Sequence, residues 1–332
     1  MPANLTQEFI AARERFQSAT GIKEKLDCLE EMLAVIPKHK GTEHMQMDIK
    51  RRISKLKDQI EQDRRKSGKH SYEYHVPPEG AGQVIIIGPP NSGKSELLAV
   101  LTSASPEIAP YPFTTRKPQP GMMEFEDIQI QLVDTPPVTG DYLEPWLTSI
   151  LRAADAAILV ADLSSDMLLD DIEAVISSFS KHKTRLVSSR SETDAGAPYG
   201  TVYVPTMILG NKLDLPGASD NFQVLAELYS GRFPVKAVSV AAGAGIEQLR
   251  RDVFDLLHIV RVYTKVPGKP ADMTKPFTLP RGSNLIDVAK AVHRDFPEKL
   301  RFARAWGIGK PDGVMIARDH IIEDRDIIEL HV

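Results

Sequence analysis

A short apolar segment of the sequence runs directly into a loop that is rich in glycine and proline. Residues 83–87 read QVIII, and residues 88–95 read GPPNSGKS before a helical stretch begins. Glycines let successive backbone amides point into one cavity, where these amides and the N-terminus of the following helix hold phosphate groups. The order of strand, loop and helix therefore predicts a phosphate-binding P-loop and makes a chance glycine-rich turn the weaker interpretation.

Beyond this loop, short apolar runs alternate with helical stretches. Such alternation is typical of a mostly parallel sheet that is covered by helices on both faces. The fold class is therefore predicted to be α/β, with residues 188–203, which lack periodicity, as a long loop. The further strands are predicted from apolar runs at residues 122–125, 128–133, 156–161, 204–209 and 237–240.

Two side chains at the end of the P-loop have chemical roles in the binding of a nucleotide. Lys94 is expected to reach the β- and γ-phosphates, and the hydroxyl group of Ser95 is expected to coordinate magnesium. The segment LVDTPP at residues 132–137 places Asp134 at the end of a strand, where its carboxylate can hold magnesium through water. Together these residues predict a magnesium-dependent nucleotide site.

The motif ILGNKLD at residues 208–214 indicates which base is bound. A buried strand delivers Asn211, Lys212 and Asp214 at its C-terminal end, where ligands bind in open α/β sheets. Asp214 can accept hydrogen bonds from N1–H and the exocyclic amine of guanine. Adenine cannot donate in this pattern, and such mismatches discriminate by about 10⁴-fold. The motif therefore predicts guanine, with an ATP-binding protein as the weaker alternative.

Two loops complete the predicted site. VSVAAGAG at residues 238–245 fits the remaining loop beside the base, with Ser239 and the backbone that follows near the guanine. YPFTTRKPQPG at residues 111–121 supplies Thr114 and Thr115 as switch hydroxyls, one of which should reach magnesium when the γ-phosphate is present. We favour Thr115 for this role.

Residues on either side of this region have different patterns. Two stripes at helical spacing predict two amphipathic helices that pack as an antiparallel hairpin, the first ending before Pro37. A linker rich in glycine and proline spans residues 67–82, and a second begins near residue 264. The predicted domains are therefore 1–76, 77–263 and 264–332. The residues of the two stripes are Ile22, Leu26, Leu29, Leu33 and Ile36, and then Ile49, Ile53, Leu56 and Ile60.

Composition excludes several classes of protein. The net charge of −4 argues against a wholly basic nucleic-acid binder, so such contacts require a local patch. The single cysteine, Cys28, excludes an intramolecular disulfide framework, and no cysteine and histidine cluster has zinc spacing. The sequence shows no signal peptide and no apolar run of about 18 residues. We therefore expect a cytoplasmic protein without a membrane partner.

The motifs GPPNSGKS, YPFTTRKPQPG, LVDTPP and NKLD together resemble the Obg-type branch of translation-factor GTPases. The C-terminal sequence, which begins RVYTKVPGKP at residue 261, resembles the TGS domain of the DRG GTPases. The resemblance implies a β-grasp fold for this domain and an association with ribosomes or structured RNA. It also implies GTP hydrolysis that is slow without a regulatory partner protein.

Three positions depart from the usual GTPase patterns. Pro137 stands where such proteins have a glycine whose amide binds the γ-phosphate, and proline has no amide hydrogen. The loss of a bond of about 1.5–3 kcal/mol predicts a preference for GTP over GDP that is weaker by roughly 10- to 150-fold. Val138 cannot orient the attacking water, as a glutamine does in Ras-like enzymes. Asn91 occupies the position of the potassium ligand in the TrmE group, but it is equally compatible with a plain turn residue.

Basic residues are concentrated in two segments. Residues 50–69 contain nine basic and three acidic residues, and basic residues also outnumber acidic ones in the TGS-like segment. Such a concentration can attract an RNA backbone, although a solvated helix face is the ordinary alternative.

These observations predict a GTP-binding protein with slow, magnesium-dependent hydrolysis and a ribosome or RNA partner. The alternative is a GTP- or GDP-binding adaptor for RNA or ribosomes with vestigial hydrolysis. Magnesium is the expected cofactor, with potassium as a second candidate. The candidate catalytic residues are Lys94, Thr115 and Asn91, and the candidate metal ligands are Ser95, Thr115 and Asp134. The candidate nucleotide contacts are Gly88, Pro89, Pro90, Asn91, Ser92, Gly93, Lys94, Ser95, Asn211, Lys212, Asp214, Ser239, Val240 and Ala241.

Overall fold

A computed structural model of the protein separates into two compact units, Met1–Glu73 and Tyr74–Val332. None of the helices in the described part of the chain is long and apolar enough to cross a membrane. The structure describes residues 15–16, 22–36, 46–47, 49–54, 74, 76–102, 117–140, 143–189, 196–307 and 311–332.

In the N-terminal unit, helix α2 (Ile22–Val35) and the helical residues 49–54 share a small apolar core. Leu29 and Met32 are buried on the first segment, and Ile49 and Ile53 are buried on the second. Spacings of three and four residues place these side chains on one face of each helix. Both predicted stripes therefore contribute to one core. The predicted stripe residues whose side chains lie outside this description are Ile22, Leu26, Leu56 and Ile60.

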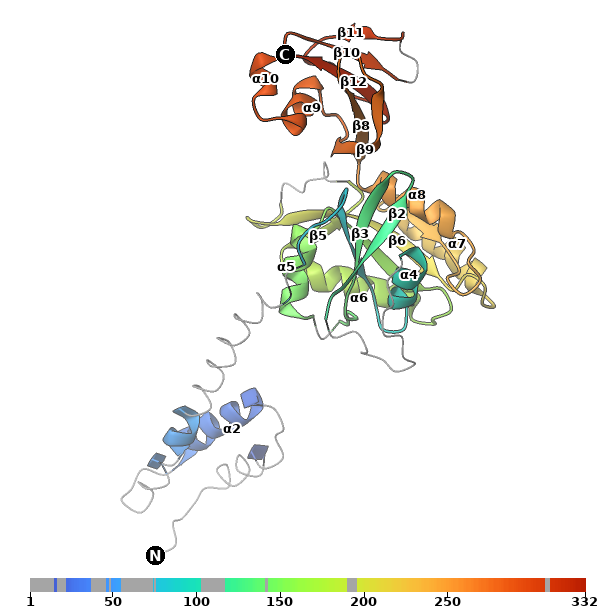
Figure 1. Cartoon of the computed structure of the whole chain (residues 1–332). Helices are drawn as coiled ribbons and strands as arrows, with labels where there is room; N and C mark the ends of the chain where they lie inside the picture. The colour runs from blue at the N-terminus through green and yellow to red at the C-terminus, as the bar shows by residue number, and fades with distance from the viewer. Residues whose placement is uncertain are drawn as a thin grey trace, which may run out of the picture. The chain divides into compact units, whose positions relative to one another are not determined.

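The second unit contains a seven-stranded sheet in the order β2-β3-β1-β4-β6-β5, with β7 also pairing with β6 (Figure 1). The pair β2–β3 is antiparallel, and the other pairs are parallel. This mostly parallel arrangement confirms the predicted fold class. The strands are β1 (Gln83–Ile87), β2 (Gln119–Phe125), β3 (Ile128–Asp134), β4 (Ala156–Asp162), β5 (Thr184–Val187), β6 (Val202–Asn211) and β7 (Val235–Ala237).

Helices cover both faces of this sheet (Figure 1). In β1, Ile85 and Ile87 face one apolar core, whereas Val84 and Ile86 face the other. Successive side chains of a strand point to opposite faces, so a wholly apolar strand is one that is buried on both sides. The first core includes α5 (Pro145–Ala153), α6 (Leu168–Lys181) and α7 (Ala218–Tyr229), and the second includes α4 (Lys94–Leu101) and α8 (Ile246–Leu256).

The C-terminal part of this unit is a five-stranded sheet in the order β11-β10-β12-β8-β9 (Figure 1). Its apolar core joins the sheet to α9, which begins at a capping box formed by Asn284 and Asp287. A capping box satisfies backbone amides that the first helical turn leaves without partners. The elements are β8 (Ile259–Lys265), β9 (Ala271–Pro280), α9 (Leu285–Val292), α10 (Phe296–Lys299), β10 (Phe302–Trp306), β11 (Val314–Ile316) and β12 (Asp326–His331).

Several element boundaries differ from those expected from the sequence. Strand β8 begins at Ile259, before the expected boundary at residue 264, and its Val260 and Val262 are buried in the C-terminal core. The short strand β5 was not predicted, because it lies between a helix and an aperiodic loop and has only four residues. The run at 237–240 overlaps β7 only at Ala237, since the chain turns there and Ser239 bridges to Ala244.

Candidate nucleotide-binding site

The P-loop follows β1 and leads into α4, as the sequence predicts. Gly93 has a φ of +91°, and a Cβ atom on it would lie 2.2 Å from Nδ2 of Asn211. Gly88 has a φ of +152°, and a Cβ atom there would lie 2.3 Å from the carbonyl oxygen of Val160. Both distances are far below van der Waals contact, so glycine is required at both positions.

Lys94 is buried beneath this loop. Its Nζ atom donates hydrogen bonds to the carbonyl oxygens of Pro89 at 2.7 Å and Gly88 at 3.2 Å. Burial lowers the pKa of Lys94 to about 8, against a smaller opposing effect of Asp134. The ammonium group is thus held at the loop that the sequence predicts to enclose the phosphates, and an anionic ligand would favour its charged form.

Ser95 and Asp134 meet at the ends of α4 and β3. The Ser95 hydroxyl donates to Oδ2 of Asp134 at 2.5 Å, and Asp134 is fully buried. The next residue, Thr135, donates to the carbonyl oxygen of Ile86 at 2.7 Å, which fixes the end of β3 against β1. A hydroxyl and a carboxylate oxygen are hard donors of the kind that magnesium prefers.

This pair fits a magnesium ion that takes its remaining ligands from phosphates and water, as is usual for the metal. Among the described residues, no group of three or more His, Cys, Asp or Glu side chains is arranged to hold a metal ion. An all-protein metal cage is thus not found there. Thr115, the predicted third ligand, lies outside the described residues, as does Thr114.

Asn211, at the end of β6, connects the phosphate side of the site to the base side. Its Nδ2 atom donates to the carbonyl oxygen of Ser92 at 3.0 Å, and its Oδ1 atom accepts from the amide of Val240 at 3.2 Å. The side chain is almost fully buried, and it fills the space that Gly93 leaves open. One amide group therefore holds two loops that are far apart in the sequence.

Asp214 and Ser239 form the predicted base side. The Ser239 hydroxyl donates a short hydrogen bond to Oδ1 of Asp214 and accepts one from the amide of Ala242 at 3.0 Å. Only one carboxylate oxygen takes part in the contact with Ser239. The arrangement places Asp214, the carboxylate predicted to read guanine, beside the 238–245 loop.

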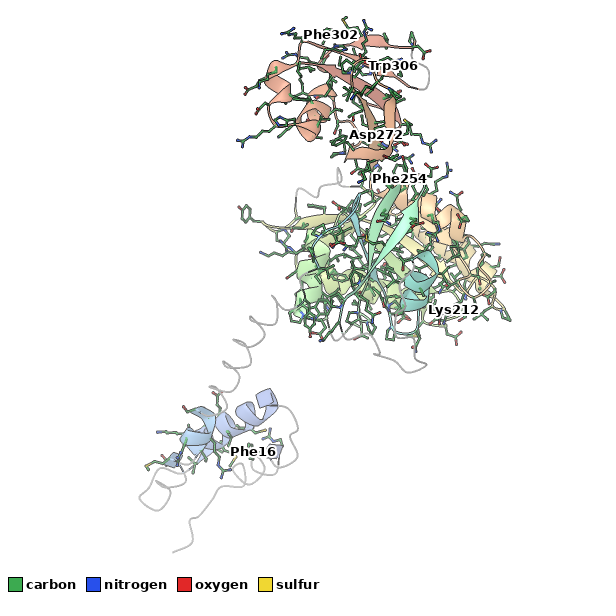
Figure 2. The ribbon with its side chains drawn as sticks, in the orientation of Figure 1. Phe16, Lys212, Phe254, Asp272, Phe302 and Trp306 are labelled. Carbon is green, nitrogen blue, oxygen red and sulfur yellow. The ribbon has the colours of Figure 1, made fainter. Side chains whose placement is uncertain are left out.

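Asp162 contacts a predicted site residue, although none of the sequence motifs includes it. It ends β4, and its Oδ2 atom binds Nζ of Lys212 at 2.5 Å, while Oδ1 accepts from the hydroxyl and amide of Ser164. Burial opposes the charge of Asp162, but the hydrogen bonds from Lys212 and Ser164 outweigh it and hold its pKa below the ordinary value. Lys212, labelled in Figure 2, directly follows β6. Its backbone is left-handed, with a φ of 66°. An acidic residue that ends the apolar run AAILVAD is the sequence signal that was available.

The segment after Asp134 is held against the P-loop. Pro136 and Pro137 carry no amide hydrogen, and the amide of Val138 donates to the carbonyl oxygen of Gly88 at 3.0 Å. The Val138 side chain is 1% exposed and belongs to the apolar core. It therefore has no contact with solvent from which to orient a water molecule.

The other predicted residues lie along the same two loops. Asn91 is exposed and has a left-handed backbone with a φ of 58°, which is compatible with both interpretations of this residue. Ala241 is exposed beside Val240. The structure thus brings together, around Asn211 and the P-loop, Gly88, Ser92, Gly93, Lys94, Ser95, Asp134, Asn211, Lys212, Asp214, Ser239 and Val240.

Comparison with known families identifies two domains. Residues 83–190 match the family described as 50S ribosome-binding GTPase, and residues 260–332 match the TGS domain. The first match includes the P-loop and Asp134, and the second includes nearly all of the five-stranded sheet. These matches confirm the GTPase and TGS domains that the sequence motifs indicated.

The similarity to known proteins extends over nearly the whole chain. An uncharacterized GTP-binding protein of Methanocaldococcus jannaschii is 26% identical, and the alignment covers 98% of each protein. The developmentally regulated GTP-binding protein 2 of Homo sapiens is 23% identical over 93% of this chain and 99% of its own length. The Schizosaccharomyces pombe YchF GTPase shares the fold, with a TM-score of 0.52 and 13% identity over 77% of this chain and 99% of its own. This chain, which joins a GTPase domain to a TGS domain, is therefore a GTP-binding protein that is similar to the developmentally regulated GTP-binding proteins over most of its length.

Proposed function

We propose that the protein hydrolyses GTP slowly in a magnesium-dependent reaction and acts in association with ribosomes or structured RNA. The observation that carries the proposal is the position of Asn211, which joins the P-loop at Ser92 to the guanine-side loop at Val240. Phosphate binding and base recognition thus share one rigid connection. A guanine nucleotide is the ligand whose two ends match these two loops.

In this proposal, Lys94 would reach the β- and γ-phosphates, and Ser95 and Asp134 would hold magnesium. When bound, magnesium neutralises charge that develops on the phosphate oxygens. Thr115 is the proposed third ligand on the magnesium. The protein groups therefore position the phosphates and supply positive charge.

The proposal that hydrolysis is slow rests on Val138 and Pro137. Val138 is buried in the core with its amide bound to Gly88, so its side chain does not orient the attacking water. Pro137 has no amide with which to bind the γ-phosphate. Catalysis then depends on a group from elsewhere, either a partner protein, the ribosome or a cation.

Asn91 is the proposed position for such a cation. The residue is exposed at the outer side of the P-loop, where a potassium ion would add positive charge close to the phosphates. Turnover should then be faster in potassium chloride than in sodium chloride at matched ionic strength. Equal rates in the two salts would leave Asn91 as a plain turn residue.

Association with ribosomes or RNA is proposed from the domain content. The matching GTPase family is described as ribosome-binding, and it is accompanied here by a TGS domain. The basic segment at residues 50–69 lies largely outside the described residues, but Arg51 and Arg52 are described and exposed. Exposed arginines are suited to contacts with a phosphate backbone.

A single-turnover assay separates this function from the alternative, an adaptor with vestigial hydrolysis. Radiolabelled GTP is bound to excess protein with magnesium, and the release of phosphate is followed with and without ribosomes. Stimulation above the protein-free rate supports the enzyme. Tight GTP binding with no hydrolysis in either condition supports the adaptor, and co-sedimentation with ribosomal subunits in each nucleotide state tests the shared partner.

A further inference from the structure

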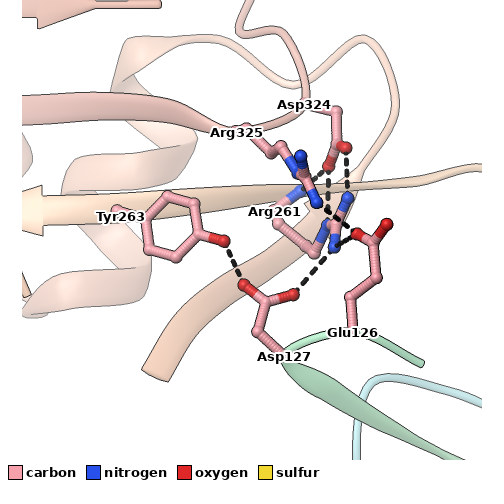
Figure 3. Close-up of polar contacts among 6 residues, drawn as sticks. All are labelled: Glu126, Asp127, Arg261, Tyr263, Asp324 and Arg325. Atoms are coloured by element: carbon pink, nitrogen blue, oxygen red, sulfur yellow. Dashed lines mark hydrogen bonds and ion pairs between the residues drawn. The ribbon is translucent and has the colours of Figure 1, made fainter. Parts of the chain in front are cut away.

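The turn between β2 and β3 makes a charged contact with the TGS domain (Figure 3). Arg261 on β8 is 3% exposed, and its Nη1 atom binds Glu126 at 2.5 Å and Asp127 at 2.7 Å. Its Nη2 atom binds Asp324 at 2.7 Å. One buried guanidinium thus joins two acidic residues of the GTPase domain to one of the TGS domain.

Three further contacts complete this arrangement, which we name the Arg261 cluster. Arg325 binds Glu126 at 2.5 Å, and the hydroxyl of Tyr263 donates to Asp127 (Figure 3). The guanidinium of Arg261 also lies 4.9 Å from the ring centroid of Phe254. The members of the cluster are Glu126, Asp127, Arg261, Tyr263, Asp324 and Arg325.

The charges of the cluster are stabilised by one another. Burial opposes the charge of Asp127, but hydrogen bonds from Tyr263 and Arg261 outweigh it and keep the pKa of Asp127 below the ordinary value. Burial and the same hydrogen bond raise the pKa of Tyr263 to about 12. The carboxylates and guanidinium groups are therefore charged at neutral pH, whereas Tyr263 stays a neutral donor, and loss of one carboxylate leaves the buried Arg261 with less compensating charge.

The opposite end of the same hairpin reaches the nucleotide site. Strand β3 runs from Ile128, next to the cluster, to Asp134, which contacts Ser95 at 2.5 Å. Ligands of magnesium lie at about 2.0–2.1 Å in octahedral geometry, so two adjacent ligands are about 3.0 Å apart. If Ser95 and Asp134 both bind magnesium directly, their oxygen atoms must move from 2.5 Å to about 3.0 Å apart. The separation is larger if Asp134 binds the ion through water.

The strands between these two ends favour movement as a unit. Strands β2 and β3 pair along their whole length, from Gln119 opposite Asp134 to Phe125 opposite Ile128. Strand β1 pairs only with the second half of β3, from Gln131 to Asp134. The residues before β1 continue this pairing, since the amide of Ala81 donates to the carbonyl oxygen of Gln129 at 2.7 Å, and the turn with Glu126 and Asp127 lies beyond it.

We propose that the β2–β3 hairpin couples magnesium binding at Asp134 to the position of the TGS domain through the Arg261 cluster. The contact seen here belongs to the state in which Ser95 and Asp134 touch, and the displacement of Asp134 weakens the cluster at the other end. Packed elements have discrete arrangements, so small shifts at a ligand site produce larger rearrangements at such an interface. The inference rests on the proposed magnesium–nucleotide site.

Because coupling is reciprocal, weakening the cluster should favour magnesium binding. The test compares Glu126→Gln with the control Glu124→Gln, which makes the same chemical change on the exposed side of the same hairpin. The dissociation constant of GDP is measured with magnesium and with a chelator, and the ratio gives the gain from magnesium. We expect this gain to increase about fivefold or more in Glu126→Gln, the lower end of typical coupling, and to be unchanged in the control.

A second measurement follows the cluster directly. Hydrogen exchange of the Arg325 amide, which donates to the carbonyl oxygen of Arg261 at 2.7 Å, should become faster when magnesium and GDP are added to the wild type. The coupling would be overturned if magnesium increased GDP affinity equally in both variants, or if exchange of the Arg325 amide did not change. Either result counts only where the proteins still bind GDP. Failure of the wild type to bind GDP in either condition would instead overturn the nucleotide site on which the inference rests.

Discussion

Replacement of Asn211 by alanine tests whether one side chain joins the two halves of the nucleotide site. The substitution leaves the Ser92 carbonyl and the Val240 amide without their partner, and both residues are buried. Each unsatisfied buried group costs about 1–3 kcal/mol, so the two together cost about 2–6 kcal/mol. If the bound state requires both loops in place, even the lower figure corresponds to a dissociation constant about 30-fold higher.

The assay measures the affinity for a fluorescent GDP analogue together with urea unfolding. Asn221→Ala is the matched control, because Asn221 donates to the carbonyl oxygen of Leu163 at 2.8 Å from helix α7, away from the P-loop. We expect the control to lose about 1 kcal/mol of stability and to keep its nucleotide affinity within about threefold. Loss of stability in Asn211→Ala with unchanged affinity would refute the connecting role. If the stability is also unchanged, the estimated cost of the unsatisfied groups is wrong.

Three further substitutions have defined outcomes. Asp162→Asn removes the charged partner of Lys212. It should weaken the binding of GDP and of a GTP analogue by the same factor, about fivefold to tenfold. Unequal factors for the two nucleotides would argue against a base-side role. Pro137→Gly restores an amide near the γ-phosphate and should raise the preference for GTP over GDP by roughly 10- to 150-fold; no increase would show that another group senses the phosphate. Lys94 has a folded-state pKa lowered from 10.5 to about 8, so the unfolded chain binds more protons between these values and stability should increase with pH across that window. The corresponding slope should be absent from the urea unfolding of Lys94→Met, and an identical slope in both proteins would contradict the assignment.

The sequence predicted most of the candidate site because its motifs combine residue type with position at a strand end. Glycines in a strand–loop–helix order specify a P-loop, and Asn211 and Asp214 follow a buried strand. The structure adds contacts that spacing does not reveal. Asp162 meets Lys212 only after β4 and β6 have paired, and the motif that contains Lys212 does not indicate this partner.

The Arg261 cluster was also not predictable, because it joins residues 126–127 to residues 261 and 324–325 across two domains. In the sequence, the arginine of this apolar strand is indistinguishable from an ordinary surface residue, because its acidic partners come from distant segments. The boundary of the last domain was expected at residue 264 for a related reason. Strand β8 follows α8 closely, so no linker composition marks the place where the second sheet begins at Ile259.

The close approach of Gly93 to Asn211 has a consequence for attempts to redesign base specificity. With 2.2 Å between a Cβ at position 93 and Nδ2 of Asn211, neither position can be varied independently of the other. Random libraries that include either residue will consist mainly of proteins with a damaged phosphate loop. Asp214 and Ser239 bond to each other on the predicted base side. A library that varies only these two residues changes the contacts to the base and leaves the phosphate loop intact.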